Sequence, residues 1–204
     1  MRGKNPPGRV AEPTSLRIIG IDPGTVITGW GVVEAIGSTL NHVAHGTIAT
    51  AGGREQGMRL SRIYRDVEAV IETYRPAGIS IERVFFARNA QSALKLGQAR
   101  GVVLLAAALH QAAVYEYAAA EIKSAVVGYG QATKEQVQMM VASLLRLPRR
   151  PPLDAADALA AAICHLHRQV FQARLAEARP NKRLIMLKKT AGQHARGRAS
   201  SRIS

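Results

Sequence analysis

The sequence predicts an α/β domain in which a mixed sheet of five strands is covered by helices on both faces. Short apolar runs rich in β-branched residues come first and are separated only by turns. Further apolar runs then alternate with segments whose apolar residues recur at helical spacing, which favours a layered α/β architecture. With 204 residues, 47% of them hydrophobic, the chain can bury the core of one domain.

The first three predicted strands form a meander. β-Branched and apolar residues dominate these runs, and turn-forming residues separate them. The strands are expected at Leu16–Ile21, which ends at Asp22-Pro23-Gly24, at Thr28–Ile36, and at His45–Thr50.

Helices and buried strands alternate in the rest of the predicted domain. Apolar spacing predicts a helix from about Met58 to Ile71, which Pro76 and Gly78 end. A strand at Gly78–Phe86, a long helix at Asn89–Gln111 capped by Asn89, and a strand at Ala113–Ala118 follow. Two helices complete the domain: one opens at Thr133 with Gln136 in the reciprocal capping-box position, and one opens at Asp154 after the Pro-rich connector Leu147–Leu153.

Positive charge is concentrated at the two ends of the chain. The formal net charge is +14, yet residues 179–204 contain eight Lys or Arg and no Asp or Glu, and residues 1–12 contain three Lys or Arg against one Glu. We therefore expect a disordered N-terminal extension at 1–15, a folded domain at 16–173 and a basic, disordered tail at 174–204. Such tails favour salt-sensitive contacts with a polyanion, so specific function is expected in the domain.

The location of the protein is predicted from what the sequence contains. Cys164 is the single cysteine, so no disulfide within the chain can form and a reducing cytoplasm is expected. The longest uninterrupted apolar stretch, Gly101–Leu109, is shorter than the roughly 18 residues of a membrane span, so no membrane partner is expected.

Four carboxylates are candidates for catalysis. Asp22 ends the first strand, Glu82 lies in a run that otherwise reads as a buried strand, and Asp154 and Asp157 are three residues apart at the start of a helix. Each also has a purely structural interpretation. Asp22 fits a turn with the Pro and Gly that follow it, Glu82 fits a salt bridge or a solvent-reaching strand end, and the helix acids fit capping and the helix dipole.

Together the four acids predict a metal site. Carboxylates from separate elements can meet at the ends of adjacent strands and at a helix N-terminus, and oxygen ligands suit hard divalent cations. Two such cations can activate a water molecule and stabilise the leaving oxygen in phosphodiester cleavage. We therefore expect two Mg²⁺ ions per site, with Mn²⁺ as a substitute.

Four sequence blocks, in order, resemble the signature blocks of the RuvC family of crossover junction endodeoxyribonucleases over about residues 16 to 168. The blocks are Ile18–Gly24 (IIGIDPG), Ile81–Phe85 (IERVF), Ser92–Gly101 (SALKLGQARG) and Asp154–Ala160 (DAADALA). The resemblance implies an RNase H-like fold and a Holliday junction resolvase that acts in recombination and repair as a homodimer, making paired symmetric nicks with 5′-phosphate ends. It also implies that Asp22, Glu82, Asp154 and Asp157 are the catalytic metal ligands.

The same resemblance suggests contacts with DNA. Phe85 matches a family aromatic that stacks on an unpaired base, although core packing also explains an aromatic residue here. Lys123 and Lys134 match lysines that face the substrate backbone. Arg88, Lys95 and Arg100 fit either phosphate contacts or the polar face of their helix. The resemblance further implies the junction-binding and branch-migration motor proteins of the Ruv system as partners.

Other function classes remain open at this stage. An actin-like or sugar-kinase ATPase has a similar first turn, but it needs a second phosphate-binding loop and usually a second lobe. A catalytically inert DNA-binding module would also be basic, but it has no need of four converging acids. A related nuclease acting on RNA or on replication intermediates differs only in its substrate.

Overall fold

The structure is a computed structural model that describes residues 15–50, 55–83 and 90–178. The chain divides into two units, Met1–Arg168 and Gln169–Ser204. The first unit contains the sheet and the helices that surround it. The described part of the second unit consists of residues 169–178, which are helical.

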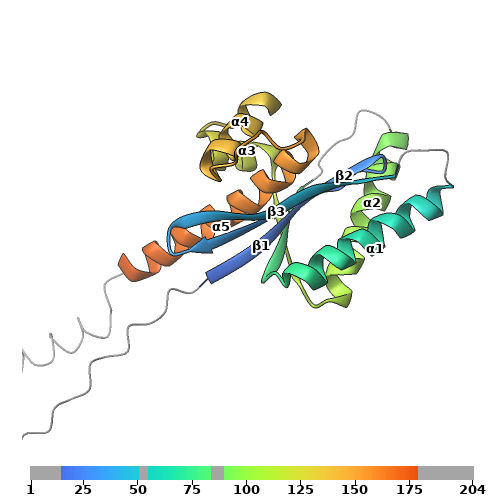
Figure 1. Ribbon diagram of the computed structural model, residues 1–204, viewed down its shortest axis with the longest axis horizontal. Helices are drawn as coiled ribbons and strands as arrows, with labels where there is room; N and C mark the ends of the chain where they lie inside the picture. Colours follow the sequence, from blue (N-terminus) through green and yellow to red (C-terminus); the bar gives the residue numbers. More distant parts are fainter. Residues whose placement is uncertain (1–14, 51–54, 84–89, 179–204) are drawn as a thin grey trace, which may run out of the picture. The chain divides into compact units, whose positions relative to one another are not determined.

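Five strands form one mixed sheet, as the sequence predicts (Figure 1). Strands β1, β2 and β3 are antiparallel neighbours, whereas β4 and β5 run parallel to β1, in the order β3-β2-β1-β4-β5. The strands are β1 (Ser15–Asp22), β2 (Ile27–Ile36), β3 (Thr39–Ala49), β4 (Gly78–Glu82) and β5 (Ala113–Tyr117).

Two strands, β3 and β4, differ from the predicted bounds by more than one residue at one end. Strand β3 begins at Thr39 rather than near His45, because a tight turn with Gly37 at a φ of 60° pairs Ile36 directly with Thr39. Strand β4 ends at Glu82, which is also the last residue that pairs with β5, and the predicted continuation at Val84–Phe86 lies outside the described residues. The charged Glu82 therefore lies at a strand end and not inside a strand.

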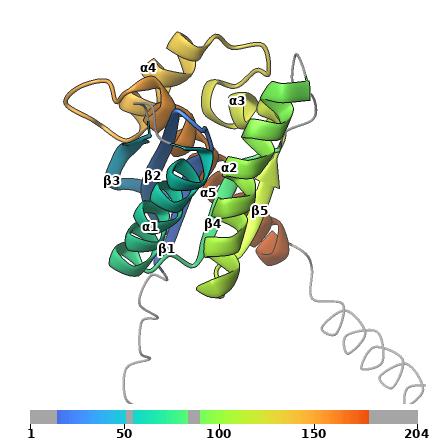
Figure 2. The same cartoon turned by 90° about the vertical axis from the view of Figure 1, so that its right-hand side faces the viewer.

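Helices cover both faces of the sheet, as predicted. Helices α1 and α2 lie side by side on one face, and α5 crosses the opposite face with α3 and α4 nearby (Figure 2). The helices are α1 (Gln56–Tyr74), α2 (Ala90–Leu109), α3 (Ala119–Val127), α4 (Lys134–Leu144) and α5 (Leu153–Ala178).

Helix α3 is absent from the sequence prediction, and its start explains why. Its N-cap is Ala118, which has no side-chain acceptor, so the usual Ser, Thr, Asp or Asn marker is missing. Only half of a capping box forms there, since the Ala118 N–H donates to the Glu121 carboxylate at 2.8 Å. By contrast, the predicted box of Thr133 and Gln136 is confirmed at the start of α4.

Glycines allow α5 to lie unusually close to β1 and β2. A Cβ atom added at Gly20 would lie 1.7 Å from the carbonyl oxygen of Ala158, and one added at Gly29 would lie 1.9 Å from that of Asp154. Neither distance is compatible with a side chain, so the helix backbone occupies the space that a larger residue would fill. The close contact at Gly29 involves the first turn of α5.

Small side chains and a buried hydrogen bond complete this contact. The Ser80 hydroxyl of β4 donates to the carbonyl oxygen of Ala161 at 2.7 Å in the buried interior. Helix α5 also contains many residues with almost no solvent exposure, among them Ala155, Ala158, Leu159, Ala162, Ile163 and Leu166. The helix is thereby fixed in its position along β1 and β4.

Helix α2 has an apolar face that the described residues leave uncovered. Ala99, Val103 and Ala106 on its inner face are fully buried against the core. Leu94 and Leu105 on its outer face are 69% and 52% exposed. Among the helices of the described ranges, only α2 is long and apolar enough to cross a membrane by length and composition. Core helices of globular domains can have the same length and composition.

We expect Gly20→Ala to destabilise the fold by about 3 kcal/mol or more, because α5 must move away from β1 to admit the methyl group. Urea unfolding followed by circular dichroism measures the change in the free energy of unfolding. Gly57→Ala in α1 is the matched control, since a Cβ there meets no atom within 4 Å. It should leave stability unchanged or raise it by up to about 1 kcal/mol. Equal effects of the two substitutions would show that the α5 contact does not limit side-chain size.

Candidate active site

Two carboxylates leave the sheet side by side at the ends of parallel strands. Asp22 is the last residue of β1 and Glu82 is the last residue of β4. The two strands are neighbours, with Ile21 paired to Ile81, so the residues that follow this pair emerge at the same edge. Strand geometry therefore brings together two acids that are 60 residues apart in the sequence.

The first turn of α5 brings the other two acids to this edge. Asp154 lies against Gly29, which is the cross-strand partner of Asp22. Asp157 is one turn further along the helix and is partly buried. The charges of both residues raise the pKa of Asp22, so both are within electrostatic range of its carboxyl group.

A cavity of about 300 Å³ lies at this edge of the sheet. Three of the four predicted acids line it, together with both predicted lysines and an apolar rim. The lining residues are Asp22, Pro23, Glu82, Leu96, Ala119, Ile122, Lys123, Lys134, Val137 and Asp157. Asp154 lies outside this lining.

The electrostatic environment of Asp22 disfavours its negative charge. Burial is the largest cause, and the neighbouring charges of Asp157, Glu82 and Asp154 add to it, whereas Lys134 acts in the opposite direction. The result is a pKa raised to about 7. An aspartate in this environment is readily neutralised, either by a proton or by a cation.

Glu82 is subject to the same effects more weakly. The residue is exposed at the end of β4, but its carboxyl group lies in the cavity and is partly desolvated. Desolvation, followed by the charge of Asp157, raises its pKa, and Lys134 and Lys123 lower it. The cavity thus holds an excess of negative charge that two lysines offset only in part.

Lys134 is bound directly to one of the acids. Its Nζ lies 2.8 Å from the Asp157 carboxylate, and this hydrogen bond is the largest cause of the raised pKa of the lysine. Its side chain is 63% exposed, so the ammonium group can leave Asp157 at little cost. In the described part of the chain, no three Asp, Glu, His or Cys side chains are close enough together to hold a metal ion.

The chemistry of the cavity nevertheless fits divalent cations. The negatively charged groups that line the cavity are all carboxylates, and hard cations such as Mg²⁺ and Mn²⁺ prefer carboxylate oxygens as ligands. Burial first, and the neighbouring carboxylates second, raise the pKa of Asp22, so a cation bound beside it would stabilise its charged form. The ammonium group of Lys134 lies 2.8 Å from the Asp157 carboxylate and partly balances its charge.

The structure brings together most of the site residues predicted from the sequence. Asp22, Glu82, Asp157, Lys123 and Lys134 line one cavity, and Asp154 lies next to it. Two further candidates for DNA contact, Phe85 and Arg88, lie outside the described residues, and Lys95 is exposed on α2.

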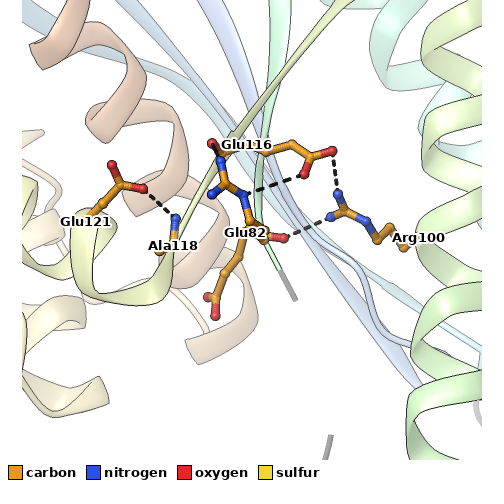
Figure 3. A network of polar contacts seen from close by, with 6 residues as sticks. Glu82, Arg100, Glu116, Ala118 and Glu121 are labelled. Atoms are coloured by element: carbon orange, nitrogen blue, oxygen red, sulfur yellow. Dashed lines mark hydrogen bonds and ion pairs between the residues drawn. The ribbon is translucent and has the colours of Figure 1, made fainter. Parts of the chain in front are cut away.

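Arg100 has a position that the sequence did not indicate. Its guanidinium group donates to the backbone carbonyl of Glu82 at 2.9 Å and pairs with Glu116 at 2.6 Å (Figure 3). From the sequence, Arg100 could be either a phosphate contact or part of the solvated face of its helix. No local pattern could have revealed the contact, because it joins residues from three separate elements.

The sequence matches one family along most of its length. The profile described as "Crossover junction endodeoxyribonuclease RuvC" matches residues 18–165. A crossover junction endodeoxyribonuclease RuvC from Geobacter sulfurreducens is 53% identical over 157 residues, covering 77% of this chain and 96% of the relative. One from Pseudomonas fluorescens is 55% identical over 150 residues, covering 74% and 86%.

Solved structures give the same result for the fold. Thermus thermophilus RuvC in complex with a Holliday junction substrate is 34% identical, with a TM-score of 0.73 over 77% of this chain and 96% of that one. The yeast mitochondrial Holliday junction resolvase Ydc2 shares the fold at 10% identity, with a TM-score of 0.56 over 81% and 86%. The predicted RNase H-like fold is confirmed.

The raised pKa of Asp22 makes stability depend on pH in a definite direction. Between about pH 3.8 and pH 7 the folded protein binds a proton that the unfolded chain has lost, so the contribution of Asp22 to stability falls as pH rises through this window. Asn cannot ionise. In EDTA, Asp22→Asn should therefore melt several degrees above the wild type at pH 8 and close to it at pH 4.

Thermal melts of the two proteins between pH 4 and pH 8 test this prediction. The difference between variant and wild type is the relevant quantity, because groups that titrate in both proteins cancel. A difference in Tm that stays constant across the range would show that the Asp22 carboxyl group is not destabilised by its surroundings.

Proposed function

Because this chain belongs to the RuvC family of crossover junction endodeoxyribonucleases, we propose that Asp22, Glu82, Asp154 and Asp157 are its catalytic residues and hold its metal ions. The protein is a metal-dependent endonuclease that resolves Holliday junctions, and its reaction belongs to DNA recombination and repair. One observation gives the strongest support for this assignment of the four acids. Acids from β1, β4 and α5 converge on a single cavity, where Asp22 has a pKa of about 7.

The reaction we propose is hydrolysis of one phosphodiester bond in each of two opposed strands. A water oxygen attacks phosphorus, the bond to the 3′ oxygen breaks, and the products are a 5′-phosphate and a 3′-hydroxyl group. Two Mg²⁺ ions, when bound, would lower the pKa of the attacking water and stabilise the leaving oxygen. Asp22 and Glu82, fixed at adjacent strand ends, would hold the ions in a constant position relative to the sheet.

The two lysines of the cavity have a separate role in this proposal. Lys123 and Lys134 would bind the backbone phosphates on either side of the scissile bond, as cations in a site that must accept a polyanion. Lys134 pairs with Asp157 in the free protein. A metal ion at Asp157 would release this ammonium group for a phosphate, so metal and DNA binding would favour each other.

We also propose that the enzyme is a homodimer that pairs through the outer face of α2, defined by Leu94, Gly97, Gly101, Leu105 and Ala108. A Cβ at either glycine would meet no atom within 4 Å, and both leucines are more than half exposed. An exposed apolar face with small residues favours close helix pairing, and a twofold dimer matches the symmetry of a four-way junction. Such a dimer presents one site to each of two opposed strands.

The cellular setting is part of the same proposal. We expect the enzyme to act in the cytoplasm on junctions delivered by the branch-migration motor proteins of the Ruv system. The relatives from Geobacter sulfurreducens and Pseudomonas fluorescens are crossover junction endodeoxyribonucleases, which supports this setting. A second copy of the chain and junction DNA are its other expected partners.

Cleavage of a labelled, branch-migrating four-way junction tests the catalytic assignment. With Mg²⁺ the wild type should make paired nicks with ligatable ends, while linear duplex and RNA–DNA hybrid remain uncut. Asp22→Asn and Glu82→Gln should each lower the cleavage rate at least about 100-fold and leave junction affinity in Ca²⁺ within a few-fold. Retained cleavage in both variants would reject this metal site, and junction binding without cleavage by the wild type would indicate a DNA-binding module.

Light scattering coupled to gel filtration tests the dimer. The wild type should elute at twice the chain mass of 21.9 kDa, and Leu105→Glu should elute as a monomer because a charge cannot be buried between two copies of α2. Met58→Glu is the control, since Met58 is an equally exposed residue on α1. A Leu105→Glu protein that remains dimeric would place the interface elsewhere.

A further inference from the structure

We propose that Arg100 is a positioning residue for the active site: from α2, it fixes the backbone of Glu82 and is itself held in place by Glu116 of β5. The inference rests on the proposed role of Glu82 as a metal ligand. Arg100 contacts the backbone carbonyl of Glu82 and is not itself one of the residues that line the cavity. It acts through the peptide unit from which the Glu82 side chain projects.

The contacts of Arg100 link three elements, α2, β4 and β5. Arg100 Nη1 of α2 donates to the Glu82 carbonyl oxygen at 2.9 Å, and Nη2 contacts Glu116 Oε1 of β5 at 2.6 Å. Strand β5 in turn pairs with β4 through Glu82 and Tyr117. The guanidinium plane therefore bridges two parallel strands at the point where their ladder ends, with the two-pronged geometry for which Arg is suited and Lys is not.

The peptide unit after Glu82 is held on both of its sides. Its N–H, which belongs to Arg83, donates to the Tyr117 carbonyl at 2.7 Å, and its C=O accepts from Arg100. In a trans peptide these two groups point in opposite directions, so the two bonds fix the rotation of the plane. The pairing of β4 with β1 ends at Ile81, one residue earlier. Arg100 thus supplies a restraint where the ladder to β1 has stopped.

This arrangement leaves the Glu82 carboxylate free for a cation. Its carboxyl group points away from Arg100, whereas its backbone carbonyl faces the guanidinium group (Figure 3). Lys134 differs in this respect, because it binds the carboxylate of Asp157 directly. Arg100 can therefore orient a metal ligand without competing with the metal for it.

The neighbours of Arg100 keep it away from a phosphate role. Its side chain is only 16% exposed, and the carboxylate of Glu116 neutralises it at 2.6 Å. Arg83 supports Glu116 in turn, with Nη2 3.3 Å from its carbonyl oxygen and Nε 4.0 Å from its carboxylate. The adjacent Ala99 is fully buried, so the packing of α2 fixes the position of the Arg100 backbone.

Metal binding measured without DNA tests the proposal. Arg100→Ala should bind Mn²⁺ about 10-fold more weakly in an electron paramagnetic resonance titration, because loss of a group that orients a ligand typically costs 10- to 100-fold. Junction cleavage should need about 10-fold more Mg²⁺ for half its maximal rate, and junction affinity in Ca²⁺ should stay within about 3-fold of wild type. Arg100→Lys, which keeps one donor, should recover part of the Mn²⁺ affinity.

A matched control separates positioning from loss of charge. Arg62 on α1 also pairs with a carboxylate at 2.6 Å, that of Asp66, and lies outside the cavity. Arg62→Ala should bind Mn²⁺ and cleave junctions like the wild type, within about 2-fold. If Arg100→Ala does not fold, Glu116→Gln decides the question, since it weakens the ion pair at constant size and should shift Mn²⁺ affinity in the same direction by a smaller factor.

Two results would overturn the proposal. Folded Arg100→Ala that binds Mn²⁺ like the wild type would remove the positioning role, and a loss of junction affinity with unchanged Mn²⁺ affinity would make Arg100 a phosphate contact. Glu82→Gln separates these failures from failure of the proposed function. If Glu82→Gln keeps Mn²⁺ affinity and cleavage, Glu82 is not a ligand. If it loses both while Arg100→Ala does not, only the positioning role is rejected.

Discussion

Helix α5 lies so close to β1 and β2 that side chains at Gly20 and Gly29 would overlap its backbone. This contact sets the distance between the first turn of α5 and the end of β1, and hence between Asp157 and Asp22. A wider gap, as between most helices and sheets, would move the helix acids away from the strand acids. The buried hydrogen bond from Ser80 to Ala161 fixes the remaining freedom, which is sliding of α5 along the sheet.

The convergence of like charges has an electrostatic cost that the free protein offsets in two ways. Asp22 has a pKa near neutrality, so a proton can replace a counterion, and Lys134 pairs with Asp157. Both arrangements are easily reversed, because a proton exchanges rapidly and an exposed lysine is held weakly. In the proposed metal site, stability and metal affinity would be linked, because the same carboxylates would determine both.

Helix α2 contributes to three features of the molecule. Leu96 lines the cavity, Arg100 holds the backbone of Glu82, and the outer face around Leu105 remains exposed. The residues on its inner face are fully buried. Leu96, Arg100 and Leu105 therefore belong to one rigidly packed helix. In the proposed dimer, the helix that joins the two copies would thus also support Glu82, the proposed metal ligand, in each.

The sequence by itself determined the elements of the fold and indicated four acids as candidates for the active site. Periodicity, turn residues and the capping box at Thr133 are local, so they predicted the mixed five-stranded sheet and most of the helices, while α3 was missed because Ala118 carries no capping side chain. Only the tertiary structure decided which groups meet. The pKa of Asp22 and the contact of Arg100 with Glu82 depend on burial and on distances between elements, and local sequence patterns contain neither.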